Sequence, residues 1–492
     1  MPKPLQLMKQ IRSAMNSINL STDNPEYQNL LESADLLLNE LMLQTETGFY
    51  LDYINKGKLL LSEGEQIVTR LGGVVEPSNV RKDLSEASSP EIFDNEIEHL
   101  HQALAELVSH LEEQRSAEEK DYLVRLSDWE TSLYSRRANQ VVYPPKSARL
   151  EITREKLQAY LQKKNPQWRG LEIRDFTSLH GGFSKQTVLF DCEDSVNGKQ
   201  SLVMRADVPV KLLHYDGCDV TREYYMIQLM DKLGLPVAKT RWLEQDTSHF
   251  DCNFIVSNKS PGRIRGASMG SSEQLPEGLV DSMLSTFYKM HNLLLDREDP
   301  LAIKSHLSEW LPHKTIYETT KHYVNVFIPN EIERTGIKPT PDLIRAVTWL
   351  KKNIPECDEP PVILHMDYSF NNLLFDGNQI SAILDWETSR LGDPADDIVW
   401  TQLSLSNVMD IGEFLRRYRE GTGRTISEYR MAYTNVAKLV LNLIGALNSI
   451  HCLDSQDNTP IKYTMLGFYY MPILCTQLNS KIAEAERIKS AD

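Results

Sequence analysis

The sequence predicts a mixed α+β protein in which a two-lobed part follows an all-helical amino-terminal part. Through residues 1–140, apolar side chains recur at helical spacing. Pro144 and Pro145 then interrupt any helix, because proline lacks an amide hydrogen and clashes with the preceding turn. From residue 151, short strand-like runs and one helix come before a largely helical remainder. That order is typical of a two-lobed α+β domain.

We therefore expect an acidic helical domain at 1–140, a linker at 141–150, a strand-rich lobe at 151–260 and a helical lobe at 261–492. The length of 492 residues fits two to three domains of roughly 150 residues each. With 41% hydrophobic and 25% charged residues, the chain is not mainly disordered.

The net charge of −16 argues against a nucleic-acid surface and against binding to an anionic membrane. The most apolar run, at 437–447, is too short to cross a bilayer. The six cysteines form no CxxC pair, so the sequence suggests neither a zinc module nor a disulfide framework. Free thiols fit a reducing compartment, and we expect a cytoplasmic location.

The clearest helix of the amino-terminal part carries an apolar stripe with alternating spacings of four and three: Phe93, Ile97, Leu100, Leu104, Leu107 and Leu111. This period is typical of helices packed on other helices. A core within the helical domain is favoured over an oligomer seam, which stays open as an alternative. The pentapeptide DWETS occurs at 128–132 and again at 385–389. The first copy has no preceding strand, so we interpret Asp128 as a surface or capping residue.

The expected elements of the two lobes are strands at 171–179, 186–192, 201–208, 241–246 and 252–259, a helix at 221–234, helices from about 275, and strand-like runs at 361–366 and 380–386.

The strongest chemical signal is the segment 365–400, which begins HMDYSFNNLLF and continues to ILDWETSRLGDPADDIVW. Asp367 follows a short apolar run, Asn372 lies five residues on, and a second strand-like run delivers Asp385. Two carboxylates and an amide on adjacent loops suit a divalent cation with oxygen ligands, such as Mg²⁺. Asn372 and Asp385 are the candidate metal ligands. Asp367 is then available to accept a proton from a hydroxyl.

A second signal lies in LHGGFSKQTVLFDC, where Gly181 and Gly182 separate two strands. Glycines allow backbone amides to approach phosphates closely. The order of elements adds weight, since a strand bearing Arg205 and a helix bearing Glu223 follow. A cation on a strand, held by a helix carboxylate, is how kinase-like folds bind nucleotide phosphates.

Together these motifs resemble the aminoglycoside phosphotransferase superfamily, which shares the protein-kinase-like fold with choline kinases. HMDYSFNN is similar to the family's catalytic loop, and ILDWETSRLGDPADD to its metal-binding strand and the segment after it. GGFSKQT resembles the phosphate loop, and NFIVSNKSPGRI the hinge between lobes. The resemblance covers roughly 150–450. Within the superfamily, the sequence looks most like the kinase domains associated with acyl-CoA dehydrogenases.

The resemblance implies a role for each site residue. Asp367 is the catalytic base, assisted by Asn372, and His365 braces the catalytic loop. The further implied residues are Asn372 and Asp385 for magnesium, Gly181, Gly182, Ser184, Arg205 and Glu223 for the phosphates, Ser257 and Lys259 for the nucleotide base, and Asp393 and Asp397 for the loop after the metal strand.

The sequence departs from the family pattern in three places. Arg205 stands where kinases usually carry lysine, and its planar fork differs from a point charge. Asn258 and Lys259 occupy hinge positions that are acidic and apolar in relatives, so ATP and GTP both stay open. Lys185 replaces a small or amide residue, with phosphate neutralisation and solvent exposure as alternatives.

We therefore expect a magnesium-dependent kinase that transfers the γ-phosphoryl group of ATP, or GTP, to a hydroxyl of a small molecule. The lobe at 261–492 would hold the catalytic loop and the acceptor pocket. One alternative narrows the acceptor to a hydroxyacyl-CoA. Another is a nucleotide-binding pseudokinase or adaptor that assembles, as a homo-oligomer, through the amino-terminal helices.

Overall fold

The computed structural model describes residues 47–72, 74, 80, 90–111, 116–135, 150, 152–164, 168, 170–179, 184–194, 198–208, 219–265, 277–305, 307–406, 408–455, 467 and 470–491. Pro144, Pro145 and the two glycines of the expected phosphate loop, Gly181 and Gly182, lie outside them. The chain forms two compact units. The helical unit comprises residues 1–148, 323–354 and 435–492, and the mixed unit comprises residues 149–322 and 355–434.

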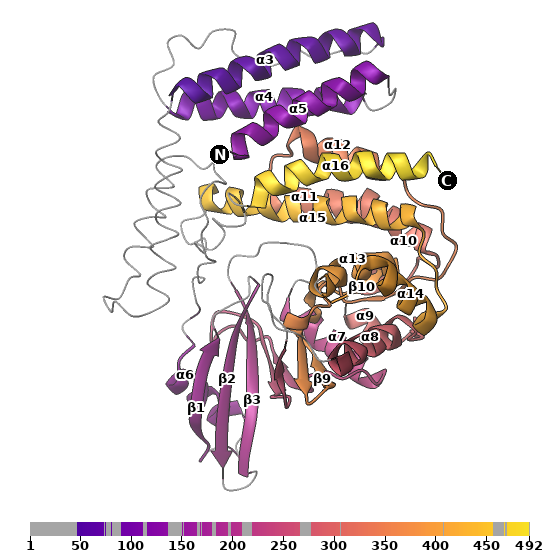
Figure 1. The fold of residues 1–492 in the computed structure, drawn as a ribbon. Helices are drawn as coiled ribbons and strands as arrows, with labels where there is room; N and C mark the ends of the chain where they lie inside the picture. The colour runs from indigo at the N-terminus through magenta and orange to yellow at the C-terminus, as the bar shows by residue number, and fades with distance from the viewer. Residues whose placement is uncertain are drawn as a thin grey trace. The chain divides into compact units, whose positions relative to one another are not determined.

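The helical unit brings together segments from both ends of the sequence (Figure 1). Its elements are α3 (Thr47–Arg70), α4 (Pro90–Leu111), α5 (Ala117–Ser135), the π-turn η3 (Tyr323–Phe327), α11 (Ile328–Thr335), α12 (Pro341–Lys352), most of α15 (Glu428–Ser455) and α16 (Met471–Lys489). Helix α3 contacts α4 and α5, α12 contacts α4, and α16 contacts α5 and α12. Residues 261–492, expected to form one lobe, are divided between the two units. The boundaries expected for the segments 1–140, 141–150, 151–260 and 261–492 stay predictions.

The apolar stripe of α4 lies in the interior of this unit. All six of its side chains, from Phe93 to Leu111, are no more than 4% exposed. Because the chain's own helices cover the stripe, the packing favours a core over an oligomer seam.

The mixed unit carries the strands. Its elements are α6 (Arg154–Lys164), β1 (Glu172–Leu179), β2 (Lys185–Asp194), β3 (Gly198–Asp207), α7 (Val220–Lys232), β4 (Thr240–Glu244), β5 (Phe254–Asn258), β6 (Arg263–Ile264), α8 (Glu277–His291), α9 (Pro300–Lys304), η2 (Leu307–Glu309), α10 (Ile316–His322), β7 (Val362–Leu364), η4 (Phe370–Asn372), β8 (Leu373–Asp376), β9 (Gln379–Ile383), η5 (Trp386–Thr388), β10 (Arg390–Gly392), α13 (Pro394–Leu405) and α14 (Ile411–Thr422). The mixed α and β class expected from the sequence, with helices before the sheet, is confirmed.

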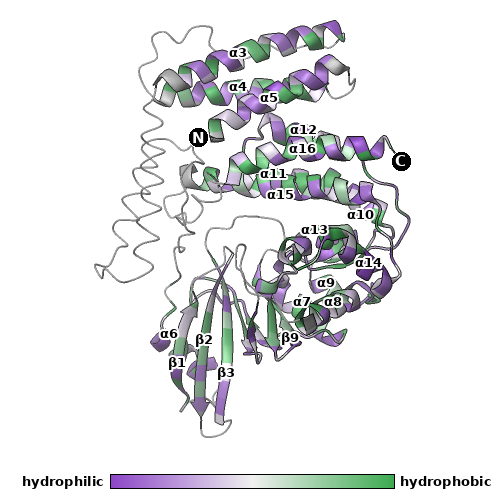
Figure 2. Ribbon diagram, in the orientation of Figure 1, coloured by the Kyte–Doolittle hydropathy of each residue, from purple (hydrophilic) through white to green (hydrophobic). Residues whose placement is uncertain are grey.

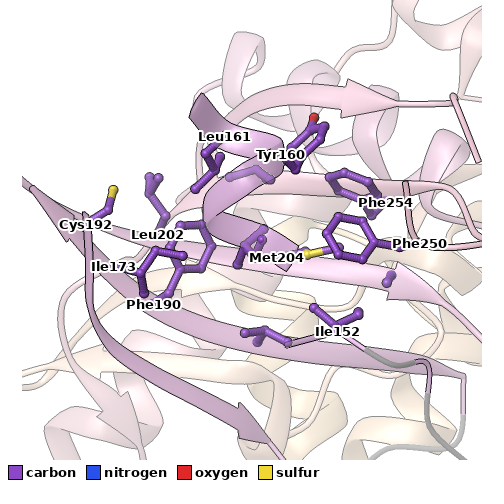
Figure 3. Close-up of a cluster of buried hydrophobic side chains, with 14 of the residues drawn as sticks. Ile152, Tyr160, Leu161, Ile173, Phe190, Cys192, Leu202, Met204, Phe250 and Phe254 are labelled. Carbon is purple, nitrogen blue, oxygen red and sulfur yellow. The ribbon is translucent and has the colours of Figure 1, made fainter. Parts of the chain in front are cut away.

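A five-stranded antiparallel sheet with the order β1-β2-β3-β5-β4 forms the first part of the mixed unit. Alternate residues of a strand face opposite sides of the sheet. On one side, Phe190, Met204 and Phe254 pack beneath Tyr160 and Leu161 of helix α6 (Figure 3). Both colours of the hydropathy scale accordingly alternate along β1 to β3 (Figure 2).

The same alternation sends Arg205 to the opposite side of the sheet from Met204. Helix α7 contacts β3, β4 and β5. The α7 side chains Met226, Leu229 and Met230 are fully buried. Arg205, near the carboxyl end of β3, therefore faces the α7 side of the sheet and not the core under α6.

Two smaller sheets follow, with β6-β8-β9 in one and β7-β10 in the other. The sequence did not predict β8, which pairs with β9 as a hairpin directly after Asn372. Among the described helices, none has the length and apolarity needed to cross a membrane.

The core under α6 yields a stability prediction. Phe254 is fully buried between α6 and the sheet, so Phe254→Ala should reduce the free energy of unfolding by about 3–5 kcal/mol. The matched control Leu294→Ala removes a side chain that is 91% exposed and should change it by less than about 0.5 kcal/mol. Urea unfolding followed by tryptophan fluorescence measures both. Equal unfolding midpoints for the two variants would contradict the packing.

Candidate functional site

The loop after β7 holds Asp367 and Asn372 together. The Nδ2 group of Asn372 donates to Asp367 Oδ2 at 2.7 Å and to the Asp367 carbonyl at 3.0 Å. The short η4 turn between them returns the chain, and the Asn372 amide N–H bonds the Ser369 carbonyl. Since its nitrogen serves Asp367, the Asn372 amide has its oxygen left to offer a cation.

Asp385 arrives from the end of β9. The Leu384 N–H donates to the Asn372 carbonyl at 2.8 Å, which fixes the strand end against the Asp367 loop. Asp385 itself has φ of 64°, a left-handed conformation that is uncommon for a residue other than glycine. Met366, directly before Asp367, has φ of 68°. Asp385 and the residue before Asp367 therefore have backbone conformations that the surrounding structure must hold in place.

Arg205 connects the sheet to both of these regions. Its Nε donates to Glu223 Oε2 at 3.1 Å, and its Nη2 donates to Asp385 Oδ1 at 2.8 Å. Glu223 lies in the first turn of α7, whose start is capped by the Asp219 side chain. The expected pair of Arg205 and Glu223 is thus present in the structure, and the contact with Asp385 extends it.

Asp397, near the start of α13, holds the backbone just before Asp367. It is fully buried and accepts hydrogen bonds from the amides of His365 at 2.8 Å and Met366 at 2.6 Å. His291 Nε2 also lies 3.1 Å from its carboxylate. The bonds to the two backbone amides explain how Met366 keeps its left-handed conformation.

His365 has a bracing position, as the resemblance implies. Its Nε2 lies 2.8 Å from the Leu384 carbonyl, and its Nδ1 accepts the Asp367 N–H at 3.2 Å. Burial lowers the pKa of His365, which favours the neutral ring that both bonds require. Asp393 caps α13 and forms a two-point ion pair with Arg430.

The structure contradicts one of the two sequence interpretations of Lys185, and phosphate neutralisation stays a prediction. Its side chain is only 2% exposed, so the solvent-facing alternative is wrong. Its ammonium pairs with Glu387, two residues after Asp385, and lies 3.5 Å from Asp207 of β3. Ser184, the one described residue of the three expected in the phosphate loop, precedes it and is partly exposed.

Ser257 and Lys259, the two residues expected at the hinge, lie in β5 and just after it. Ser257 is buried and pairs in register with Val203 of β3. The Lys259 N–H donates to the Ser201 carbonyl, while the Asn258 N–H donates to the Lys239 carbonyl. Both amides are therefore engaged within the protein, and no described contact joins this segment to Asp367 or Asp385.

The electrostatics of the site favour a cation. Burial, with repulsion from Asp385, raises the pKa of Asp367 to about 7. Burial also raises the pKa of Glu223 to about 7, although Arg205 opposes the rise. Acidic side chains at the site outnumber basic ones: the acids are Asp367, Asp385, Glu223 and Glu387, and the bases are Arg205 and Lys185. A divalent ion held by the oxygens of Asn372 and Asp385 would offset this excess, and the donor set fits Mg²⁺.

Comparison with known proteins agrees with these motifs. Residues 219–432 match the sequence model described as "Phosphotransferase enzyme family", so the chain carries a domain of this family. The resemblance read from the motifs is thereby confirmed.

Acyl-CoA dehydrogenase family member 11 of Mus musculus is 27% identical over 261 residues, which cover 50% of this chain and 30% of that protein. Family member 10 of Mus musculus is 25% identical over 189 residues, which cover 38% of this chain and 17% of that protein. The chain thus spans less than a third of each of these curated relatives. The crystal structure of aminoglycoside phosphotransferase APH(4)-Ia aligns with a TM-score of 0.45 at 15% identity, covering 67% of this chain and 99% of that one.

The bracing by Asp397 is testable through stability. Asp397→Asn replaces one acceptor oxygen by an amide donor, so a buried backbone N–H loses its partner. The free energy of unfolding should fall by about 1–3 kcal/mol. Asp358→Asn, at an exposed position of the same unit, should change it by less than about 0.5 kcal/mol. Urea unfolding of both variants decides, and an unchanged Asp397→Asn protein would refute the bracing.

Proposed function

We propose that the mixed unit is a magnesium-dependent phosphotransferase that moves the γ-phosphoryl group of ATP to a hydroxyl of a small molecule. The observation that carries the proposal is that Asp367 is bonded by Asn372 and Asp385 by Arg205. A hydrogen bond from the Leu384 N–H to the Asn372 carbonyl joins the two loops. The family of residues 219–432 supports the same reaction class.

Each residue would contribute positioning or charge. Asp367 would orient the acceptor hydroxyl and take its proton as the new bond forms. The Asn372 amide would fix the orientation of the Asp367 carboxylate, since it donates a hydrogen bond to Oδ2. Mg²⁺, held by Asn372 and Asp385, would neutralise charge on the phosphate oxygens. Reactions of this class rest mainly on such positioning and electrostatic stabilisation.

Arg205 would serve the phosphates directly. Its side chain is 21% exposed, whereas its partner Glu223 is only 1% exposed. The Nε and Nη2 groups of the guanidinium bond protein carboxylates, and its exposed part would be available to bind a ligand. Gly181, Gly182 and Ser184 would cover the phosphates, and Ser257 and Lys259 would lie near the base. ATP is the proposed donor, with GTP as the second nucleotide to test.

For the acceptor we propose a hydroxyacyl-CoA. The support is the similarity to two acyl-CoA dehydrogenase family members, which this chain matches over part of its length. Aminoglycosides are the competing acceptor class, because the aligned solved structure is an aminoglycoside phosphotransferase. The five described cysteines are all free, which supports the reducing, cytoplasmic compartment that we propose for such an enzyme.

The test is turnover of Mg²⁺-ATP by the full chain with each acceptor class in turn. Asp367→Asn should lower kcat by about 10²–10⁴-fold, the usual range for a lost general base, while leaving nucleotide binding intact. Asp376→Asn is the matched control, because Asp376 is an exposed aspartate on the neighbouring strand β8. It should keep wild-type activity.

The outcomes separate the alternatives. Turnover with hydroxyacyl-CoA alone that is lost in Asp367→Asn supports the full proposal. Turnover with aminoglycosides alone contradicts the proposed acceptor and favours aminoglycosides in its place. Turnover that survives Asp367→Asn contradicts the role of Asp367. Nucleotide binding without turnover across the panel favours the pseudokinase, which would then be examined for self-association through the helical unit.

A further inference from the structure

Two carboxyl groups and one thiol, from three different helices, lie close together in the interior of the helical unit. They are Glu130 of α5, Asp342 in the first turn of α12 and Cys475 of α16. One ligand atom from each, two carboxylate oxygens and the Sγ, lies within 4.8 Å of the other two. Glu130 and Cys475 are fully buried, and Asp342 is 3% exposed. The cluster is separate from the phosphotransferase residues, all of which belong to the mixed unit.

The hydrogen bonds around the cluster leave one atom without a partner. The Asp342 N–H donates to Glu130 Oε2 at 3.1 Å, and the Ser127 hydroxyl donates to Asp342 Oδ2 at 2.7 Å. Asn479 of α16 in turn donates to the Ser127 oxygen. Glu130 Oε1 has no hydrogen-bond partner among the described residues, although it is buried. Such an atom is costly unless something else satisfies it.

A proton alone accounts for this arrangement poorly. Two carboxyl groups are buried side by side, so a shared proton would be the simplest way to remove charge. The Thr340 hydroxyl also bonds the Glu130 carboxylate, but as a donor, so it does not supply the acceptor that a protonated Oε1 would need. The guanidinium of Arg345, the cation that acts on Asp342, bonds the Asn479 amide oxygen instead of Glu130. A cation at the centre of the three atoms would satisfy Oε1 and the thiolate together.

We propose that Glu130, Asp342 and Cys475 form a structural site for a Zn²⁺-class cation that ties α5, α12 and α16 together. Carboxylates and a cysteine thiolate are both established zinc ligands. The thiolate selects against Mg²⁺ and Ca²⁺, which prefer oxygen donors alone. Three protein donors leave the fourth tetrahedral position to a water molecule. The Ser127 and Asn479 side chains would orient Asp342, as outer-shell groups do in metal sites.

The test uses the full chain, stripped of metal by a chelator and then titrated with Zn²⁺ while Mg²⁺ is in excess. Wild type should retain one tightly held equivalent of zinc per chain after gel filtration. Cys475→Ser and Glu130→Gln, which preserve side-chain shape, should weaken zinc binding at least about tenfold, since even outer-shell substitutions often cost 10–100-fold. Cys452→Ser, at another buried cysteine of the same unit, should bind like wild type.

Cobalt supplies a second readout, and its wild-type part does not depend on any variant folding. Co²⁺ bound to wild type should show thiolate-to-metal charge-transfer absorption, which Cys475→Ser should lose and Cys452→Ser should keep. Zinc should also raise the melting temperature of wild type more than that of Glu130→Gln, since a ligand of the folded state stabilises it. No retained zinc and no charge-transfer band in wild type would overturn the site. Equal zinc affinity of wild type and both cluster variants would overturn it as well.

Discussion

The arrangement of the mixed unit depends on one guanidinium. Arg205 sits on β3, bonds Glu223 of α7 and also bonds Asp385 after β9, three segments that are far apart in the sequence. Strand alternation fixes its side of the sheet, because Met204 and Ala206 occupy the core under α6. Without that cation, Glu223 would be a nearly inaccessible carboxylate with no ion pair. Removing one partner of a buried pair is among the costlier changes in a protein.

Around this link, Asp385 and the residue before Asp367 have conformations that the backbone disfavours. Met366 and Asp385 are left-handed, and such positions cost about 1–3 kcal/mol each. Asp397 offsets part of that cost by accepting the His365 and Met366 amides, while the Asn372 carbonyl accepts the Leu384 amide. A fixed geometry for Asp367 before any ligand arrives is what a reaction based on positioning requires.

The sequence predicted the parts of this site that follow from local order. Asp367 and Asn372 are five residues apart in one loop. The order of a glycine turn, a strand with Arg205 and a helix with Glu223 predicted the pairing of these two residues. It did not predict the ion pair of Lys185 with Glu387, because their 202-residue separation leaves no local pattern. The packing of α12 and α16 with α4 and α5 was missed for the same reason. In the first DWETS copy, Asp128 is exposed as expected, but Glu130, two residues on, is buried against a distant helix.

The importance of Arg205 is tested most directly by the affinity of the full chain for Mg²⁺-ATP, measured by calorimetry. Arg205→Met keeps the side-chain length and removes the charge, so affinity should fall about tenfold or more, as expected for a charged hydrogen bond worth 1.5–3 kcal/mol. The affinity of Arg205→Lys should lie between those of wild type and Arg205→Met, because an ammonium keeps the charge but lacks the planar guanidinium geometry. Arg174→Met, at an exposed arginine of β1, should bind like wild type. Wild-type affinity in a folded Arg205→Met protein would contradict the role assigned to Arg205.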